Sequence, residues 1–195
     1  MTLALDPKTS ALLVMDYQSA IVGMLEGDKA ALLARMAELI AAARARGMMV
    51  VYVVVGFRAG YPEVSPANAI FAPIKQSGMF GPGAAGVEIH AAVAPEGNEV
   101  VVTKHRVGAF LGTDLDMVLR ANGIGTMVLA GIATSGVVLS TLRHAADADY
   151  RLVVVEDCCA DRDGEVHRVL MEKVFPRQAA VARAEAVRAA LAAQP

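Results

Sequence analysis

The stretch MVLAGIATSGVVLST, residues 127–141, passes from an apolar run through a turn into a segment with helical spacing. The run at residues 127–130 is short and uninterrupted, as in a parallel strand buried on both faces. The segment after it predicts a helix over residues 135–147. Such a turn presents backbone N–H groups at a helix N-terminus, where negative charge is stabilised. The same stretch also suits an ordinary strand-to-helix connection capped by Thr134 or Ser135.

Strand and helix alternate on both sides of this stretch. Apolar runs rich in Val, Ile and Leu occupy residues 11–15, 48–55, 99–103 and 152–155, and helical patterns occupy residues 28–46, 113–121, 163–174 and 184–193. Gly47 and Gly123 stand where helices would end, and Thr113 and Asp163 stand where N-caps are expected. The alternation predicts a doubly wound α/β sheet with helices on both faces. No repeat or linker interrupts it, so we expect one domain over residues 1–195.

Composition narrows the function classes. The chain has 195 residues, of which 55% are hydrophobic, which is ample for a buried sheet. Its net charge of −2 and its lack of a basic stripe argue against nucleic acid as a partner. Residues 1–10 lack an apolar core, and no apolar run approaches the roughly 20 residues that span a bilayer, so we expect neither a signal peptide nor a membrane anchor. The only cysteines, Cys158 and Cys159, are adjacent and suit a reducing compartment, so the expected location is cytoplasmic.

Two charged residues directly follow predicted strands. Asp16 follows the run at residues 11–15, and Lys104 follows the run at residues 99–103. In an open parallel sheet, ligands bind beyond the carboxyl ends of the strands, where both side chains would project. Each could equally be the first solvated residue after a strand. If the two lie close together, the ammonium favours the carboxylate form of the aspartate.

Three separated segments together resemble a known family. They are LLVMDYQ at residues 12–18, TKHRVGAF at residues 103–110 and GIATSGVVLST at residues 131–141. In this order they are similar to the isochorismatase-like hydrolases, whose members include isochorismatases, nicotinamidases and N-carbamoylsarcosine amidases. The resemblance extends over about residues 11–180. It implies a three-layer α/β/α fold with a mainly parallel six-stranded sheet in the order 3-2-1-4-5-6, a small-molecule substrate, no cofactor, and a homodimer or higher homo-oligomer.

The resemblance also implies roles for individual residues. Asp16 matches the family's catalytic Asp, and Lys104 matches the Lys that holds it. Ile132 and Ala133 match the site of a non-proline cis peptide, and the turn continues through Thr134, Ser135 and Gly136 as an oxyanion-binding wall. The family's nucleophilic Cys would be expected at position 137, where this sequence has Val137.

Valine has neither a nucleophilic atom nor a proton to give up, so the usual acyl-enzyme route is closed. The long stretch at residues 56–86 offers no Asp-x-His pair, and no metal site is expected. Isochorismatases provide a precedent without the cysteine, because their Asp is thought to protonate the enol carbon of a vinyl ether. By this resemblance Asp16 would be a general acid. Their third motif usually contains Tyr-Ala-His, which this chain replaces with Ala133-Thr134-Ser135, so isochorismate itself is an insecure assignment.

Two other interpretations of the function stay open. The chain could be a catalytically silent relative that binds a small ligand or a partner protein. It could instead be an amidohydrolase with a displaced nucleophile such as Cys158 or Cys159, although free cysteines are usually small buried hydrophobes. The Gly- and Pro-rich stretch at residues 56–86 is expected to shape a pocket. Candidate pocket residues are Gln18, Phe57, Arg58, Tyr61 and Phe110, with Arg58 able to hold a carboxylate, unless Arg58 lies in solvent and the aromatics only pack.

Overall fold

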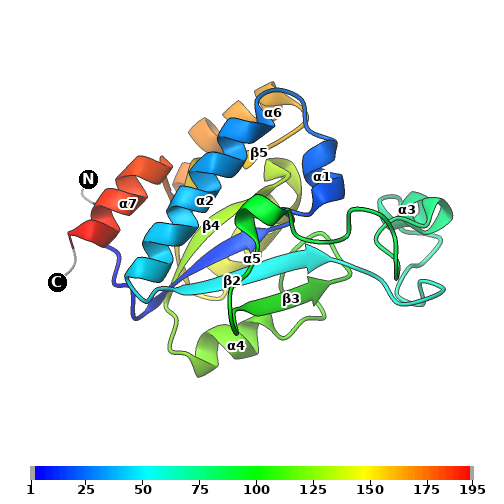
Figure 1. Cartoon of the computed structure of the whole chain (residues 1–195), viewed down its shortest axis with the longest axis horizontal. Coiled ribbons are helices and arrows are strands. Elements are labelled where there is room, and N and C mark those ends of the chain that lie inside the picture. The colour runs from blue at the N-terminus through cyan, green and yellow to red at the C-terminus, as the bar shows by residue number, and fades with distance from the viewer. Residues whose placement is uncertain (1–2, 194–195) are drawn as a thin grey trace.

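A computed structural model describes residues 3–193. Its centre is a parallel six-stranded sheet in the order β3-β2-β1-β4-β5-β6 (Figure 1). The strands are β1 (Ser10–Met15), β2 (Met49–Val55), β3 (Val100–Lys104), β4 (Thr126–Ile132), β5 (Arg151–Ala160) and β6 (Ala180–Ala182). The predicted α/β class and strand order are confirmed.

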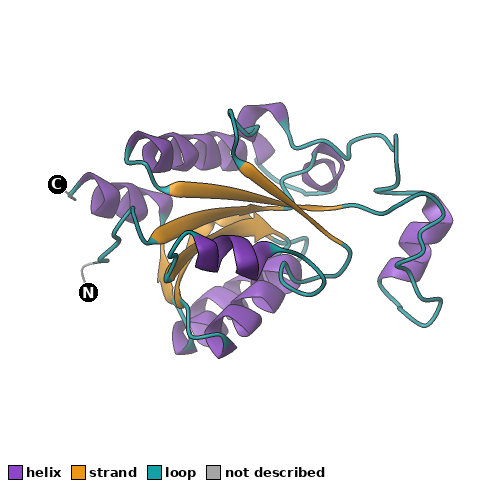
Figure 2. Ribbon diagram, turned by 90° about the horizontal axis from the view of Figure 1, so that it is seen from below, coloured by secondary structure: helices purple, strands orange, loops and turns teal. Residues whose placement is uncertain are grey.

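Helices lie on both sides of this sheet (Figure 2). The α-helices are α1 (Ser19–Gly23), α2 (Lys29–Ala45), α3 (Phe71–Ser77), α4 (Leu115–Ala121), α5 (Leu139–Asp147), α6 (Gly164–Val169) and α7 (Ala184–Ala192). Two π-helical segments, η2 (Thr134–Val138) and η3 (Leu170–Val174), and two short 3-10 turns, η1 (Ala91–Val93) and η4 (Phe175–Arg177), complete the described chain. None of the helices within residues 3–193 is long and apolar enough to cross a membrane.

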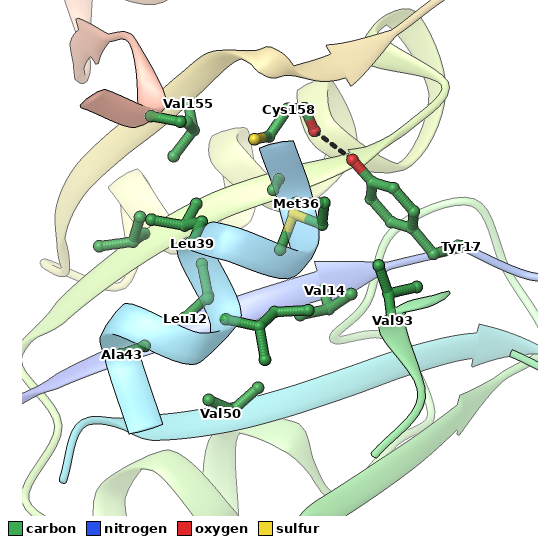
Figure 3. Packing of buried hydrophobic residues seen from close by; sticks show 14 of the residues in the cluster. Leu12, Val14, Tyr17, Met36, Leu39, Ala43, Val50, Val93, Val155 and Cys158 are labelled. Carbon is green, nitrogen blue, oxygen red and sulfur yellow. Dashed lines mark hydrogen bonds between the residues drawn. The ribbon is translucent and has the colours of Figure 1, made fainter. Parts of the chain in front are cut away.

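Strand side chains alternate between two cores. Leu12 and Val14 of β1 pack with α2 and α7, whereas Leu13 and Met15 pack with α4, α5 and η3. Burial on both faces is why the β1 run is uninterruptedly apolar. Figure 3 shows the first core, where Met36 of α2 lies over β1.

A buried tyrosine links the end of β1 to β5. Tyr17 follows the site residue Asp16, and its hydroxyl donates to the carbonyl of Cys158 at 2.8 Å (Figure 3). Both residues are almost fully buried. Since a buried polar group is costly unless it is hydrogen-bonded, this bond helps to fix the chain directly after Asp16.

Several boundaries differ from the sequence prediction. The strand expected at residues 152–155 extends over Arg151–Ala160, with a register shift between Leu129 and Gly131 of its neighbour β4. The helix expected from residue 113 begins later, and Asp114 is its N-cap. The Thr113 hydroxyl donates to the carbonyl of Ala109 at 2.6 Å and accepts the amide of Leu115, the first residue of α4, at 3.3 Å. Asp163 caps α6 as predicted, accepting from two backbone amides.

The stretch at residues 56–86 forms an arm that extends away from the sheet and carries α3 (Figures 1 and 2). A small satellite core, which includes Phe57, Val64, Phe71 and Phe80, holds the arm together. The sequence of this stretch has no helical or strand pattern. Its internal core explains how so many Gly and Pro residues can still form an ordered connection.

Candidate active site

The ends of β1 and β3 bring opposite charges together. The ammonium of Lys104 lies 2.9 Å from Asp16 Oδ2 and also donates to the carbonyl of Arg106 at 3.1 Å. Asp16 Oδ1 is buried and has no hydrogen-bond partner within residues 3–193. The two strands are not neighbours, since β2 lies between them, so the pair joins distant parts of the sheet edge. The convergence expected from the sequence is present.

This ion pair is almost sealed from solvent. Asp16 is 5% exposed and Lys104 is 3% exposed. Burial raises the pKa of the Asp16 carboxyl to about 6, and the charge and hydrogen bond of Lys104 oppose that rise. The carboxyl group can therefore gain and lose a proton near neutral pH, which an ordinary surface aspartate cannot do.

The backbone of Asp16 is also unusual. Its φ is +58°, in the left-handed region that only a few per cent of non-glycine residues adopt, with Asp and Asn among the enriched types. The Asp16 amide donates to the carbonyl of Val53 at 2.8 Å, so β2 fixes the turn away from β1. Non-glycine residues in this conformation cluster at functional sites.

The turn after β4 lies at the same edge of the sheet. Met15 pairs with Gly131, so the chain reaches the cis peptide between Ile132 and Ala133 beside the end of β1. The π-helical segment η2 then carries Val137, which is 2% exposed and belongs to the core that contains Met15. The residue at the expected nucleophile position is thus packed inside the protein.

Gly131 permits the close approach of these two segments. A Cβ atom at this position would lie 3.1 Å from the Met15 Cβ and carbonyl oxygen and 3.1 Å from Val138 Cγ2. These distances are tighter than ordinary van der Waals contacts, and one of the atoms belongs to the backbone. A larger residue would press the strand end that carries Asp16 away from the turn.

Two hydrogen bonds connect this turn to the segment that follows β5. Neither was predicted from the sequence. The Ser135 amide donates to Asp161 Oδ2 at 2.7 Å, and Thr134 Oγ1 shares a hydrogen bond of 2.8 Å with His167 Nδ1. Thr134 is fully buried, so His167 satisfies a hydroxyl that water cannot reach. Nothing in the spacing of Asp161 and His167 along the sequence indicated these partners.

The five candidate pocket residues separate into different surroundings. Gln18 is buried and makes three hydrogen bonds to the backbone of Val55 and Val87. The Phe57 ring packs into the satellite core, while the Arg58 side chain is 71% exposed and lies 2.6 Å from Glu63.

The remaining two aromatics serve other contacts. The Tyr61 hydroxyl donates to the carbonyl of Met79 at 3.0 Å, which ties two parts of the arm. Phe110 stacks on His144 with ring centroids 4.3 Å apart. Phe110 belongs to the core that includes residues of α4 and α5, whereas Phe57 belongs to the satellite core of the arm.

A cavity of about 620 Å³ opens between the arm and the β3 edge. Gln18, Phe57 and Arg58 line it, together with Thr103, His105 and Asp114. Asp16, Lys104 and Val137 are not among its lining residues. The cavity and the buried ion pair therefore share the carboxyl edge of the sheet, but they do not share a surface in this conformation.

Comparison with known proteins decides the family. The isochorismatase domain family matches residues 10–186, which include every element of the site described above. The chain belongs to the isochorismatase family of hydrolases. Membership of this family agrees with the observed order of the sheet.

Three similar proteins align with most of the isochorismatase-family chain. It is 35% identical to the uncharacterised isochorismatase family protein YecD of Escherichia coli O157:H7, over 97% of this chain and 100% of the relative. It is 36% identical to the ureidoacrylate amidohydrolase RutB of Variovorax paradoxus, over 83% of this chain and 73% of the relative. An isochorismatase family protein from Burkholderia thailandensis superposes with a TM-score of 0.82 at 32% identity, covering 98% and 100% of the two chains.

In this isochorismatase-family chain the two cysteines point into different cores. Cys158 packs beneath α2 and α7, and Cys159 packs on the opposite face of the sheet. Burial raises the pKa of the Cys158 thiol to about 12 and raises that of Cys159 further. Neither thiol has the exposed, electropositive surroundings of a reactive cysteine.

We expect both thiols to resist iodoacetamide in the folded protein at pH 8, because a nucleophilic cysteine must be both ionised and accessible. Mass mapping of alkylated peptides measures this directly. Unfolding in urea should make both residues react fully and provides the control. Rapid alkylation of either one in the native state, with loss of function, would restore the displaced-nucleophile reading.

Proposed function

We propose that this chain is a small-molecule hydrolase that works without a thiol nucleophile, with Asp16 as the general acid and base and Lys104 as the residue that orients it. The proposal is supported by a difference between the two oxygens of the Asp16 carboxyl group. Oδ2 is held by Lys104 at 2.9 Å, and Oδ1 is buried with no partner. A carboxyl oxygen left unpaired in this way is available to carry a proton to a substrate.

Vinyl ether hydrolysis fits these residues best. In the acid form, Asp16 would give its proton to the enol carbon and leave an oxocarbenium ion. Water would then add to the cationic carbon, a proton would return to Asp16, and the resulting hemiketal would break into a carbonyl compound and an alcohol. This sequence needs no covalent intermediate with the protein, so Val137 does not prevent it.

The cavity beside the arm would hold the substrate. Phe57 would supply an apolar wall and Arg58 a cation at the cavity mouth, because both line the cavity of about 620 Å³. Gln18 would act indirectly, since its hydrogen bonds hold β2 to the segment at Val87. Entry of a substrate to Asp16 requires that the covering side chains move, because Asp16 is not exposed in the cavity.

The test is turnover of a panel of vinyl ethers, amides and carbamoyl compounds by the native protein and by Asp16→Asn. We expect hydrolysis of at least one vinyl ether and a loss of about a hundredfold or more in Asp16→Asn, the usual size of a general acid's contribution. Because the acid form is lost as pH rises through about 6, turnover should fall above that pH.

The matched control is Asp147→Asn, which makes the same change at an exposed position at the end of α5. It should leave turnover unchanged. Equal activity in the native protein and Asp16→Asn would remove the general-acid role, whatever the substrate.

A second candidate function has its own support. The polar centre is closed, with Val137 only 2% exposed, and the cavity beside it is separate. These features also suit a silent relative that binds a small ligand without converting it. Such a protein would be stabilised against heat by a member of the panel, and chromatography would recover that compound intact after long incubation.

A further inference from the structure

The end of β3 presents neighbouring side chains to different surroundings. Lys104 is buried against Asp16, whereas Thr103 and His105, on either side of it, line the cavity of about 620 Å³. Successive side chains of a strand point to opposite faces, which explains this alternation. His105 therefore lies on the cavity wall and is one peptide bond away from the buried ion pair.

One ring nitrogen of His105 is bonded within the protein. Its Nδ1 lies 2.5 Å from the carbonyl oxygen of Gly56. A carbonyl oxygen only accepts hydrogen bonds, so the proton of this bond must be on Nδ1. An uncharged imidazole holds a single N–H, and in the neutral ring Nε2 therefore has a lone pair and no proton.

The second ring nitrogen of His105 has no partner within residues 3–193. Nε2 is not among the buried polar atoms without a hydrogen bond, so solvent reaches it. The ring packs beside Phe57, with ring centroids 6.0 Å apart, and Gly56 and Phe57 line the same cavity. The amide group of Gln18, also on the cavity wall, is already bonded to the backbone. His105 thus offers the cavity a hydrogen-bond acceptor that the protein does not use itself.

We propose that His105 is a specificity-determining residue, whose Nε2 accepts a hydrogen bond from a hydroxyl group of the substrate. This inference rests on the proposed use of the cavity for substrate, and it names the substrate class as an ether that also carries a hydroxyl group. A substrate with a methoxy group at the same place has no proton to donate and loses this bond. Proton transfer remains with Asp16, so the role of His105 is measured as binding.

Nitrogen NMR of the native protein tests the protonation of the ring. At pH 8, where an imidazole is mostly uncharged, long-range ¹H–¹⁵N spectra should place the proton of His105 on Nδ1 and none on Nε2. His90 is the internal control, because its Nδ1 accepts the amide of Ala92 at 3.2 Å and its proton should therefore be on Nε2. A proton on Nε2 of His105 at this pH would overturn the inference.

Two unreactive ethers test the hydrogen bond to a ligand. Phenoxyethanol carries a hydroxyl group, and its methyl ether carries a methoxy group at the same place. During a titration with phenoxyethanol, the Nε2 resonance of His105 should shift until the site is saturated. The affinity for phenoxyethanol should be about fivefold higher than for the methyl ether, which is the effect of one hydrogen bond between uncharged groups.

Two variants separate this contact from a structural role of the ring. His105→Asn keeps a side-chain N–H that can bond the Gly56 carbonyl, but it has no atom at the place of Nε2. It should bind the two ethers equally and leave the Gly56 amide resonance in place. His105→Gln extends an amide oxygen toward the place of Nε2, and it should recover part of the preference for the hydroxyl group.

The inference is overturned if the native protein binds both ethers equally, or if neither ether shifts the His105 resonance in a saturable way. A preference for phenoxyethanol that persists in folded His105→Asn would also overturn it, because another group would then accept the bond. If His105→Asn does not fold, the native spectra and the two native affinities still decide. None of these measurements depends on turnover, and the general-acid role of Asp16 is tested separately by Asp16→Asn.

Discussion

Replacing Lys104 with methionine is expected to lower the free energy of unfolding by about 3–5 kcal/mol at pH 8, the usual cost of removing one partner of a buried ion pair. The Asp16 carboxylate would keep its burial and lose the ammonium 2.9 Å away. Its other oxygen has no partner that could compensate. Urea denaturation followed by circular dichroism measures the change, provided that the slope of the transition stays constant.

The double variant Asp16→Asn with Lys104→Met tests why the single variant Lys104→Met loses stability. If the loss comes from an uncompensated carboxylate, the double variant should be more stable than Lys104→Met alone. Lys173→Met, at an exposed position in η3, should change stability by less than about 0.5 kcal/mol. A loss below about 1 kcal/mol in Lys104→Met would mean that Asp16 is not held as a carboxylate by this lysine.

We also expect Asp16 to make the folded protein more stable at low pH than at high pH, which is the opposite of ordinary acid denaturation. The pKa of Asp16 is raised from 3.8 to about 6, so the folded state holds this proton more tightly than the unfolded state does. The stabilising contribution is fully present below pH 4 and is lost as pH rises through about 6. A shift of about two pH units corresponds to about 3 kcal/mol.

Other carboxyl groups contribute with the opposite sign. Hydrogen bonds to Arg120 and Tyr150 lower the pKa of Asp116, against a smaller opposing effect of desolvation, so its contribution is lost as pH falls. The unfolding free energy of the native protein, measured against pH, therefore sums contributions of opposite sign. Subtracting the unfolding free energy of Asp16→Asn at each pH isolates Asp16. We expect this difference to fall by up to about 3 kcal/mol between pH 4 and pH 7, and a flat or rising difference would contradict the raised pKa.

The sheet was predictable where its strands are buried on both faces. The β1 and β2 runs are short, apolar, rich in Val and Leu and bounded by helical patterns, and these properties together located them. The edge strand β6 has only three residues, Ala180–Ala182, and its small side chains produce no pattern. Only the family resemblance indicated a sixth strand. Helix α3 was not predicted, because Pro73 and the surrounding glycines are typical of irregular structure. Its stability comes from the satellite core of the arm.

The site residues also differ in how far the sequence could predict them. The position of Asp16 and Lys104 after predicted strands made them candidates, because ligands bind beyond the carboxyl ends of parallel strands. Position alone suited a solvated residue equally well, and the family resemblance is what indicated a role for both. Asp161 and His167 were not found, because their partners in the turn are 26 and 33 residues away in the sequence. Contacts of this range depend on how β5 and α6 settle against η2, and no local pattern encodes that arrangement.

The left-handed conformation of Asp16 restricts what a protein engineer can change in this scaffold. At a φ of +58°, Asp, Asn and Gly are tolerated, whereas β-branched and bulky side chains are disfavoured. A library that randomised position 16 would therefore consist mostly of poorly folded members. Val137 is restricted for a different reason, because it is 2% exposed and packed in the core with Met15, so only side chains of similar volume are expected to fit there.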